Sequence, residues 1–246
     1  MLLYILTGSI CYSLINLDAT AIAQTMISRP IVISPLIGSV LGLLNGDVAS
    51  GARVGITIGV LLEFFWINIS SLGSSVPSNA AISSVAATAV VCYLSKKAQI
   101  VGAGLCACPI EPYWITTGLI YGVCCGYAGG RTDTLIRALN AGLVNNATPF
   151  VEKGELSVIN RLNLQAIGLS LAINTLLCAG LTVIGISFLP IILKFFPQEV
   201  LLALKNALYM FLLVCMGIAL EAVMTKKSIF YFGAVWVIAA VIMAGR

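Results

Sequence analysis

Long apolar stretches separated by short polar ones make up most of the chain. The apolar stretches cover approximately residues 2–27, 31–44, 52–69, 80–94, 100–127, 164–193, 200–223 and 228–245. A helix needs about 20 residues to cross the ~30 Å hydrocarbon core of a bilayer, so the longer stretches predict membrane-spanning helices. The stretches 31–44 and 80–94 are shorter, which favours re-entrant or buried pieces. The pattern therefore predicts an all-α, polytopic membrane helix bundle.

Two polar interruptions predict broken or re-entrant helices and helical hairpins within this bundle. One covers residues 69–79, where serine, glycine, proline and asparagine separate two apolar helices. The other is Pro109–Pro112, inside the 100–127 stretch. Irregular backbone at membrane depth persists only where protein or a water-filled cavity satisfies its polar groups, and transporters place binding sites at such breaks. We therefore expect a site near residues 69–79.

Composition excludes other classes of protein. About 60% of the residues are hydrophobic and 9% are charged, which excludes an ordinary soluble domain and a disordered chain. Residues 1–246 are therefore interpreted as a single integral membrane domain. The net charge of +4 comes from basic residues beside apolar segments, a placement that orients membrane helices, so no nucleic-acid partner is expected. If the 100–127 stretch folds back at Pro109–Pro112, Lys96 and Lys97 lie in the cytoplasm together with the basic residues of 131–161. A single crossing would separate the two groups, so the basic residues favour the hairpin.

The longest polar stretch, residues 129–163, mixes charged with apolar positions. This mixture is typical of a helical connection in the cytoplasm or at the membrane interface. We interpret the stretch as a cytoplasmic linker, with a docking surface for a soluble partner as the alternative.

Glycines recur at four-residue spacing in three places, which predicts helix faces that allow close backbone contact. The series are Gly38 and Gly42; Gly51, Gly55 and Gly59; and Gly118, Gly122 and Gly126. A surface that slides past a neighbouring helix is the alternative interpretation.

The sequence gives little support to a catalytic site or a metal site. The chain has no histidine, and its eight cysteines form no paired Cys-x-x-Cys array. We therefore expect no catalytic residues, no metal and no cofactor, and interpret the cysteines as small apolar helix residues. An intramembrane redox enzyme is the alternative that this interpretation leaves open.

The chemistry-bearing candidates are acids and amides near the first break. Glu63 lies inside an apolar helix, where an ionisable group is costly and indicates function; burial as a neutral acid is the alternative. Asp47 follows Gly46 and suits either a helix cap or a site. Arg29 suits an interface anchor or the partner of a buried acid such as Asp18. Further acid candidates are Glu111 and Glu221.

Sugars bind through carboxylate and amide hydrogen bonds and aromatic contacts. The residues of these types lie close together in the sequence: Glu63, Trp66, Asn68, Ser74, Ser75 and Asn79.

At this point the sequence resembles the membrane C component (enzyme IIC) of mannose–fructose–sorbose phosphotransferase systems (PTS). The motifs that carry the resemblance are Arg29-Pro30, Gly38-x-x-x-Gly42, Gly46-Asp47, Leu62-Glu63, Gly73 to Ala81 with Pro77 and Asn79, and Gly154-Glu155-Leu156. The likeness is strongest over residues 29–94. Asn79 stands where the family pattern has aspartate, and the chain is longer between Arg29 and Glu63.

The resemblance implies a multi-pass sugar permease subunit in the bacterial inner membrane. It would pair with a homologous IID subunit, assemble as a trimer of such pairs, and move a hexose by an elevator motion. Cytoplasmic IIB and IIA subunits would carry the phosphate. Glu63 and Asn68 would bind the sugar hydroxyls, with Ser74, Ser75, Asn79 and Asp47 completing the substrate-binding set. The competing hypothesis is an ion-coupled or facilitative transporter without a phosphorelay, in which Glu63 or Glu111 carries protons.

Overall fold

The computed structural model describes residues 1–19, 25–66, 78–101, 112–151 and 156–223. The elements in chain order are α1 (Leu2–Asn16), the 3₁₀ turn η1 (Leu17–Ala19), α2 (Pro30–Asn45), α3 (Val48–Trp66), α4 (Ala80–Val101), α5 (Pro112–Val151), α6 (Leu156–Phe195) and α7 (Gln198–Val223). The described residues contain helices and no strand, so the predicted all-α class is confirmed.

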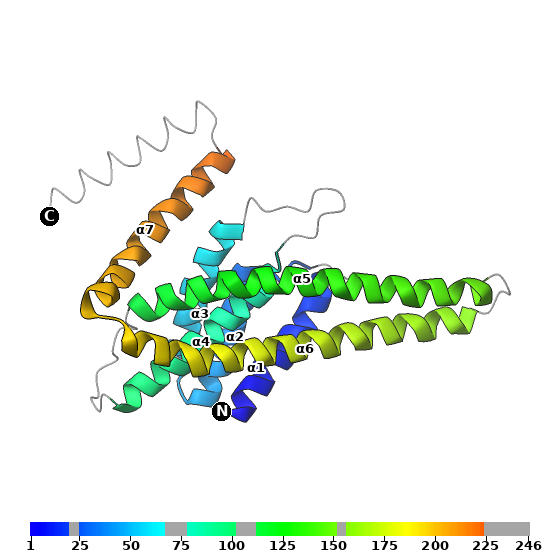
Figure 1. The fold of residues 1–246 in the computed structure, drawn as a ribbon, viewed down its shortest axis with the longest axis horizontal. Helices are drawn as coiled ribbons and strands as arrows, with labels where there is room; N and C mark the ends of the chain where they lie inside the picture. Colours follow the sequence, from blue (N-terminus) through cyan, green and yellow to red (C-terminus); the bar gives the residue numbers. More distant parts are fainter. Residues whose placement is uncertain (20–24, 67–77, 102–111, 152–155, 224–246) are drawn as a thin grey trace.

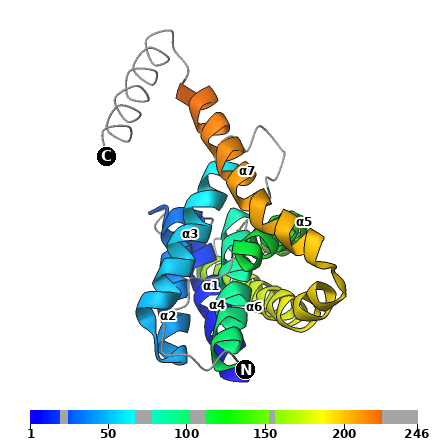
Figure 2. The same ribbon diagram turned by 90° about the vertical axis from the view of Figure 1, so that its left-hand side faces the viewer.

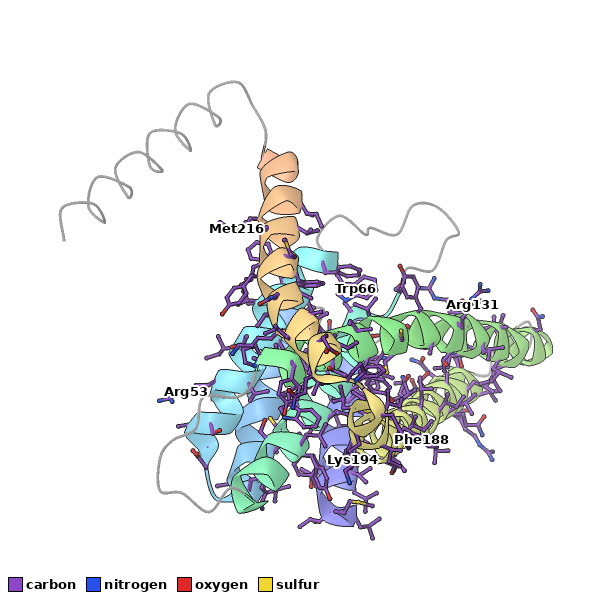
Figure 3. The ribbon with its side chains drawn as sticks, turned by 60° about the vertical axis from the view of Figure 1, so that its left-hand side comes forward. Arg53, Trp66, Arg131, Phe188, Lys194 and Met216 are labelled. Atoms are coloured by element: carbon purple, nitrogen blue, oxygen red, sulfur yellow. The ribbon has the colours of Figure 1, made fainter. Side chains whose placement is uncertain are left out.

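Within the described residues, three helical spans are long and apolar enough to cross a bilayer. They are Val48–Trp66, Ser157–Phe195 and Gln198–Ile218, and Leu2–Asn16, Pro30–Asn45 and Ala80–Lys96 are shorter apolar helices. Phe188 of α6 and Met216 of α7 point away from the bundle, as Figure 3 shows, and both side chains are exposed. An apolar outer surface of this kind suits lipid or another membrane protein, and the predicted membrane helix bundle is confirmed.

Helices α2 and α3 form a tightly packed antiparallel hairpin on one flank of the bundle (Figure 2). Gly46 closes α2 in the left-handed conformation, with φ of 85°. A Cβ added to Gly51 would lie 2.1 Å from the carbonyl oxygen of Gly38, and one added to Gly55 would lie 2.2 Å from that of Ser34. The backbones are therefore in direct contact, which confirms the packing interpretation of these glycines.

Helix α4 lies at the centre and is buried on every side over its first three turns. Small residues line it, and the glycine face of α5 packs against it. A Cβ on Gly122 would lie 2.7 Å from the carbonyl oxygen of Ser83, and one on Gly118 would lie 2.3 Å from Val91 Cγ2. The third glycine series therefore also serves close helix packing.

Helices α5 and α6 run side by side and extend well beyond the bundle (Figure 1). Each has 40 residues. The predicted linker 129–163 is the outer part of this pair, since α5 continues to Val151 and α6 begins at Leu156. The stretch is therefore helical over its described residues, and its cytoplasmic placement stays a prediction.

Several boundaries differ from the apolar stretches. The first helix ends at Asn16, well before residue 27, and Asp18 follows in η1. Helix α4 continues past residue 94 to Val101, because Lys96, Lys97 and Gln99 are favourable helix residues despite their polarity. Helix α5 begins at Pro112, which suits the first helical position. Residues 102–111, with Pro109 and Glu111, lie outside the described residues, as does 228–245.

Candidate functional site

Glu63 lies near the end of α3, where it meets the start of α2. Its Oε1 is 3.1 Å from Nη1 of Arg29, and its Oε2 accepts a hydrogen bond from the backbone N–H of Ile31 at 3.3 Å. The N–H groups of the first helical turn have no partner within their helix and favour negative charge. The Glu63 side chain is 15% exposed, whereas that of Arg29 is 55% exposed. Glu63 is therefore a partly exposed acid paired with Arg29 and with the first turn of α2, and not a fully buried one.

Asp18 makes different contacts from those expected for a partner of Arg29. Its carboxylate accepts hydrogen bonds from the backbone N–H and the hydroxyl of Thr25, at 2.6 and 2.8 Å, and from the N–H of Ile27 at 2.9 Å. These donors, the Thr25 N–H first, lower the pKa of the Asp18 carboxyl. As an anion, Asp18 therefore joins η1 to the described residues just before α2.

Asn79 lies directly before α4 and is buried. Its side-chain oxygen accepts a hydrogen bond from the N–H of Ile82 at 3.1 Å, which makes it the N-cap of α4. Its Nδ2 donates toward Asp133 Oδ2 at 2.8 Å and faces Tyr12 Oη and Asn16 Oδ1, each at 3.3 Å. Its backbone N–H donates to the carbonyl of Gly126 at 2.9 Å. Asn79 therefore connects α1, α4 and α5.

Trp66, the last described residue of α3, contacts the same part of α4 and α5. Its indole N–H donates to Ser83 Oγ at 3.3 Å, and its ring lies edge-on to Tyr127 with centroids 5.8 Å apart. A Cβ on Gly126 would lie 2.8 Å from the indole. The side chain lies beside α5 in Figure 3. Trp66 and Asn79, which lie on either side of residues 67–77, are therefore both held by the stretch of α5 around Gly126.

Asp47 is remote from these residues. Its Oδ1 accepts a hydrogen bond from the N–H of Ser50 at 3.0 Å, which caps α3. Asp47 and Glu63 lie sixteen residues apart on one helix, roughly 24 Å at 1.5 Å per residue. Of the two interpretations, the structure shows the cap.

Two hollows lie at the turn of the α2–α3 hairpin. The smaller, about 30 Å³, has room for about one water molecule and is lined by Gly42, Asn45, Asp47, Ser50, Gly51, Val54, Cys92, Ser95 and Lys96. The larger, about 360 Å³, is lined by Met1, Leu3, Tyr4, Leu44, Asn45, Tyr93 and Lys96. None of the described residues lining the larger hollow carries a carboxylate, so the sugar-binding side chains expected from the sequence do not gather there.

The predicted binding set is thus divided by the structure. Glu63 and Asn79 lie at the two described ends beside 67–77, while Asn68, Ser74 and Ser75 lie outside the described residues. Sequence reasoning missed Asp133, which it grouped with the linker. A signal was present, because Asp133 follows Gly122, Gly126 and Gly129 at helical spacing and so shares their packed face.

Comparison with known proteins agrees with this architecture. The sequence model of a family described as "PTS system sorbose-specific iic component" matches residues 1–244. Among curated protein sequences, none gives a significant match. Among the solved structures that are similar in fold, two are each aligned over 98% of this chain and 87% of their own.

One of these structures is titled only as a membrane protein, with a TM-score of 0.65 and 16% identity. The other is the mannose transporter ManYZ in complex with a microcin, with a TM-score of 0.56 and 18% identity. Since the family model covers nearly every residue, the chain belongs to the family of PTS sorbose-specific IIC components.

Proposed function

We propose that this PTS permease component binds a hexose at the junction of α3 and α4 and carries it across the bacterial inner membrane by an elevator motion. It would work paired with a IID subunit, in a trimer of such pairs, and a cytoplasmic IIB subunit, charged by IIA, would phosphorylate the sugar. The match of the family model across residues 1–244 is the observation that carries the proposal. The geometry of Glu63 and Asn79 supports the location.

Glu63 is suited to hydroxyl recognition. A carboxylate has about four acceptor positions, and Arg29 and Ile31 use two of them. The remaining lone pairs can accept hydrogen bonds from sugar hydroxyls, with the exposed guanidinium of Arg29 as a nearby donor. We assign Glu63 and Asn68 to the hydroxyls, and Ser74, Ser75 and Asn79 to the floor beneath them. Asp47, at the other end of α3, is proposed as a helix cap instead.

The absence of histidine in the sequence supports a division of labour between subunits. A phosphohistidine relay requires histidine, so the phosphate carriers would lie on the partners. The α2–α3 hairpin supports the motion, because backbones in direct contact move as one rigid body.

Sugar binding by the purified pair tests the proposal. The chain would be co-expressed with its IID subunit, and equilibrium binding of radiolabelled mannose, fructose and sorbose measured in detergent. We expect Glu63→Gln to weaken binding at least about tenfold, or about 1.4 kcal/mol. Glu199→Gln, which neutralises an exposed carboxylate at the start of α7, is the matched control.

Two results would contradict the proposal. Unchanged binding in both Glu63→Gln and Asn68→Ala would remove the site assignment. Uptake driven by a pH gradient, without IID, IIB or IIA, would support the ion-coupled alternative.

A further inference from the structure

The side-chain amide of Asn79 is held in one orientation by its surroundings. Its oxygen faces the N–H of Ile82, and its nitrogen faces the carboxylate of Asp133. Rotating the amide by 180° would oppose oxygen to carboxylate and nitrogen to a helix N–H, and both contacts would be repulsive. The surroundings therefore allow only one orientation of the amide. The carboxylate of Asp133 contributes more to this preference than the Ile82 N–H, since hydrogen bonds to a charged group are shorter and stronger.

The amide nitrogen also has more acceptors than hydrogens. It carries two N–H bonds, whereas Asp133, Tyr12 and Asn16 offer three oxygens within 3.3 Å. Asp133 is the closest at 2.8 Å, and Tyr12 and Asn16 share the other hydrogen. Loss of the Asp133 contact would leave the amide nitrogen with two longer bonds to α1, while the amide oxygen keeps its bond to Ile82.

The position of Asp133 on α5 is fixed by packing. Gly126 and Gly129 lie on the same face of α5 and bring its backbone against Asn79, since a Cβ on Gly129 would lie 2.9 Å from Asn79 Cβ. The backbone N–H of Asn79 bonds to the carbonyl of Gly126. Trp66 contacts Gly126 as well. One stretch of α5, residues 126–133, therefore orients both Trp66 and Asn79.

We propose that Asp133 is a positioning residue of the sugar-binding site: its carboxylate orients the Asn79 amide and so fixes where α4 begins. This inference rests on the proposed function, because Asn79 affects sugar binding only if it belongs to the proposed binding site.

Exchanging the two side chains tests the inference. Asn79→Asp keeps an N-cap for α4 but places two carboxyl groups about 3 Å apart, as the present 2.8 Å distance requires. The pair must then repel or take up a shared proton, and in both cases the amide N–H donor to Asp133 is lost. The double variant Asn79→Asp with Asp133→Asn restores a donor and an acceptor with the direction reversed. On the purified IIC–IID pair, we expect Asn79→Asp to raise the Kd for hexose at least tenfold and the double variant to return within threefold of the wild type.

Thermal midpoints establish that each variant is folded, and Glu199→Gln is the matched control for carboxylate loss. Normal binding by Asn79→Asp would overturn the inference, and so would a folded double variant that binds no better than Asn79→Asp.

Amide hydrogen exchange of residues 78–90 in the same samples separates this inference from the proposed function. We expect exchange in the first turns of α4 to rise in Asn79→Asp and to recover in the double variant, whether or not sugar is present. A wild type that binds no sugar would refute the proposed function alone. Exchange that is equal in all variants would refute the role of Asp133, whatever the wild type binds.

Discussion

Replacement of Gly51 by alanine is expected to destabilise the α2–α3 hairpin. The new Cβ would lie 2.1 Å from the Gly38 carbonyl oxygen and 2.7 Å from Gly42 Cα, whereas ordinary contact begins at 3.4 Å. The helices would have to separate by about 1.3 Å at this crossing, the difference between 3.4 and 2.1 Å. Overpacking costs about 1–3 kcal/mol, and the upper end applies because the opposing atoms are backbone that cannot rotate away.

The intrinsic helix preference of alanine over glycine opposes this cost by about 1 kcal/mol, which leaves a net loss of about 2 kcal/mol. For a chain of this size that corresponds to a fall in thermal midpoint of roughly 4–8 °C. The midpoint would be measured in detergent from the monodisperse fraction that survives heating.

Gly180→Ala in α6 is the matched control, because a Cβ there meets no atom within 4 Å. Its midpoint is expected to stay level or rise. If Gly51→Ala were as stable as Gly180→Ala, the backbone contact between α2 and α3 would be refuted.

Two further predictions concern the charged groups. Arg29→Gln and Glu63→Gln remove the same ion pair, whose contribution to stability is at most about 1 kcal/mol given the exposure of Arg29, so both should lower the thermal midpoint little and equally. Glu63→Gln should lose more sugar affinity than Arg29→Gln, and equal losses would contradict direct hydroxyl binding by Glu63. Because the pKa of Asp18 is lowered in the folded chain, its stabilising effect is complete at neutral pH and is lost as the pH falls below its ordinary value of 3.8. Asp18→Asn should therefore flatten the fall in melting temperature as the pH drops below 3.8, and an unchanged profile would refute this role.

The pairing of Arg29 with Glu63 could have been predicted once the α2–α3 hairpin was recognised. Close contacts join Gly42 with Gly51 and Gly38 with Gly55, and in both pairs the residue numbers sum to 93. The numbers 29 and 63 sum to 92, so the same register brings the two charges together. The glycine spacing and the Gly46-Asp47 turn carried this information. Sequence reasoning used the glycines for packing but not for register.

The role of Asp133 required tertiary information. Asn79 before an apolar run is an N-cap signal that the sequence alone provides. Its contact with Asp133 spans 54 residues and depends on how α5 docks against α4. The length of α5 and α6 was also hidden, because both helices continue beyond the apolar stretches into polar residues. In α5 many of these are glycine, threonine and asparagine, which do not favour helix, so the packing of α5 against α6 sustains it.

The same charges predict how the site would treat the phosphorylated product. Helix N-termini commonly bind anions, but those of α2 and α4 already receive Glu63 Oε2 and Asn79 Oδ1. Arg29 is paired with Glu63, and Asp133 adds a second carboxylate. A neutral hexose is not repelled by these carboxylates. A sugar phosphate would be repelled by both of them and would find no free helix N-terminus to bind. In competition with radiolabelled hexose on the IIC–IID pair, we therefore expect the hexose 6-phosphate to bind at least tenfold more weakly than the hexose. Equal or tighter binding of the phosphate would mean that Arg29 leaves Glu63 to receive it, and the ion pair would then be part of product handling instead of the support of the site.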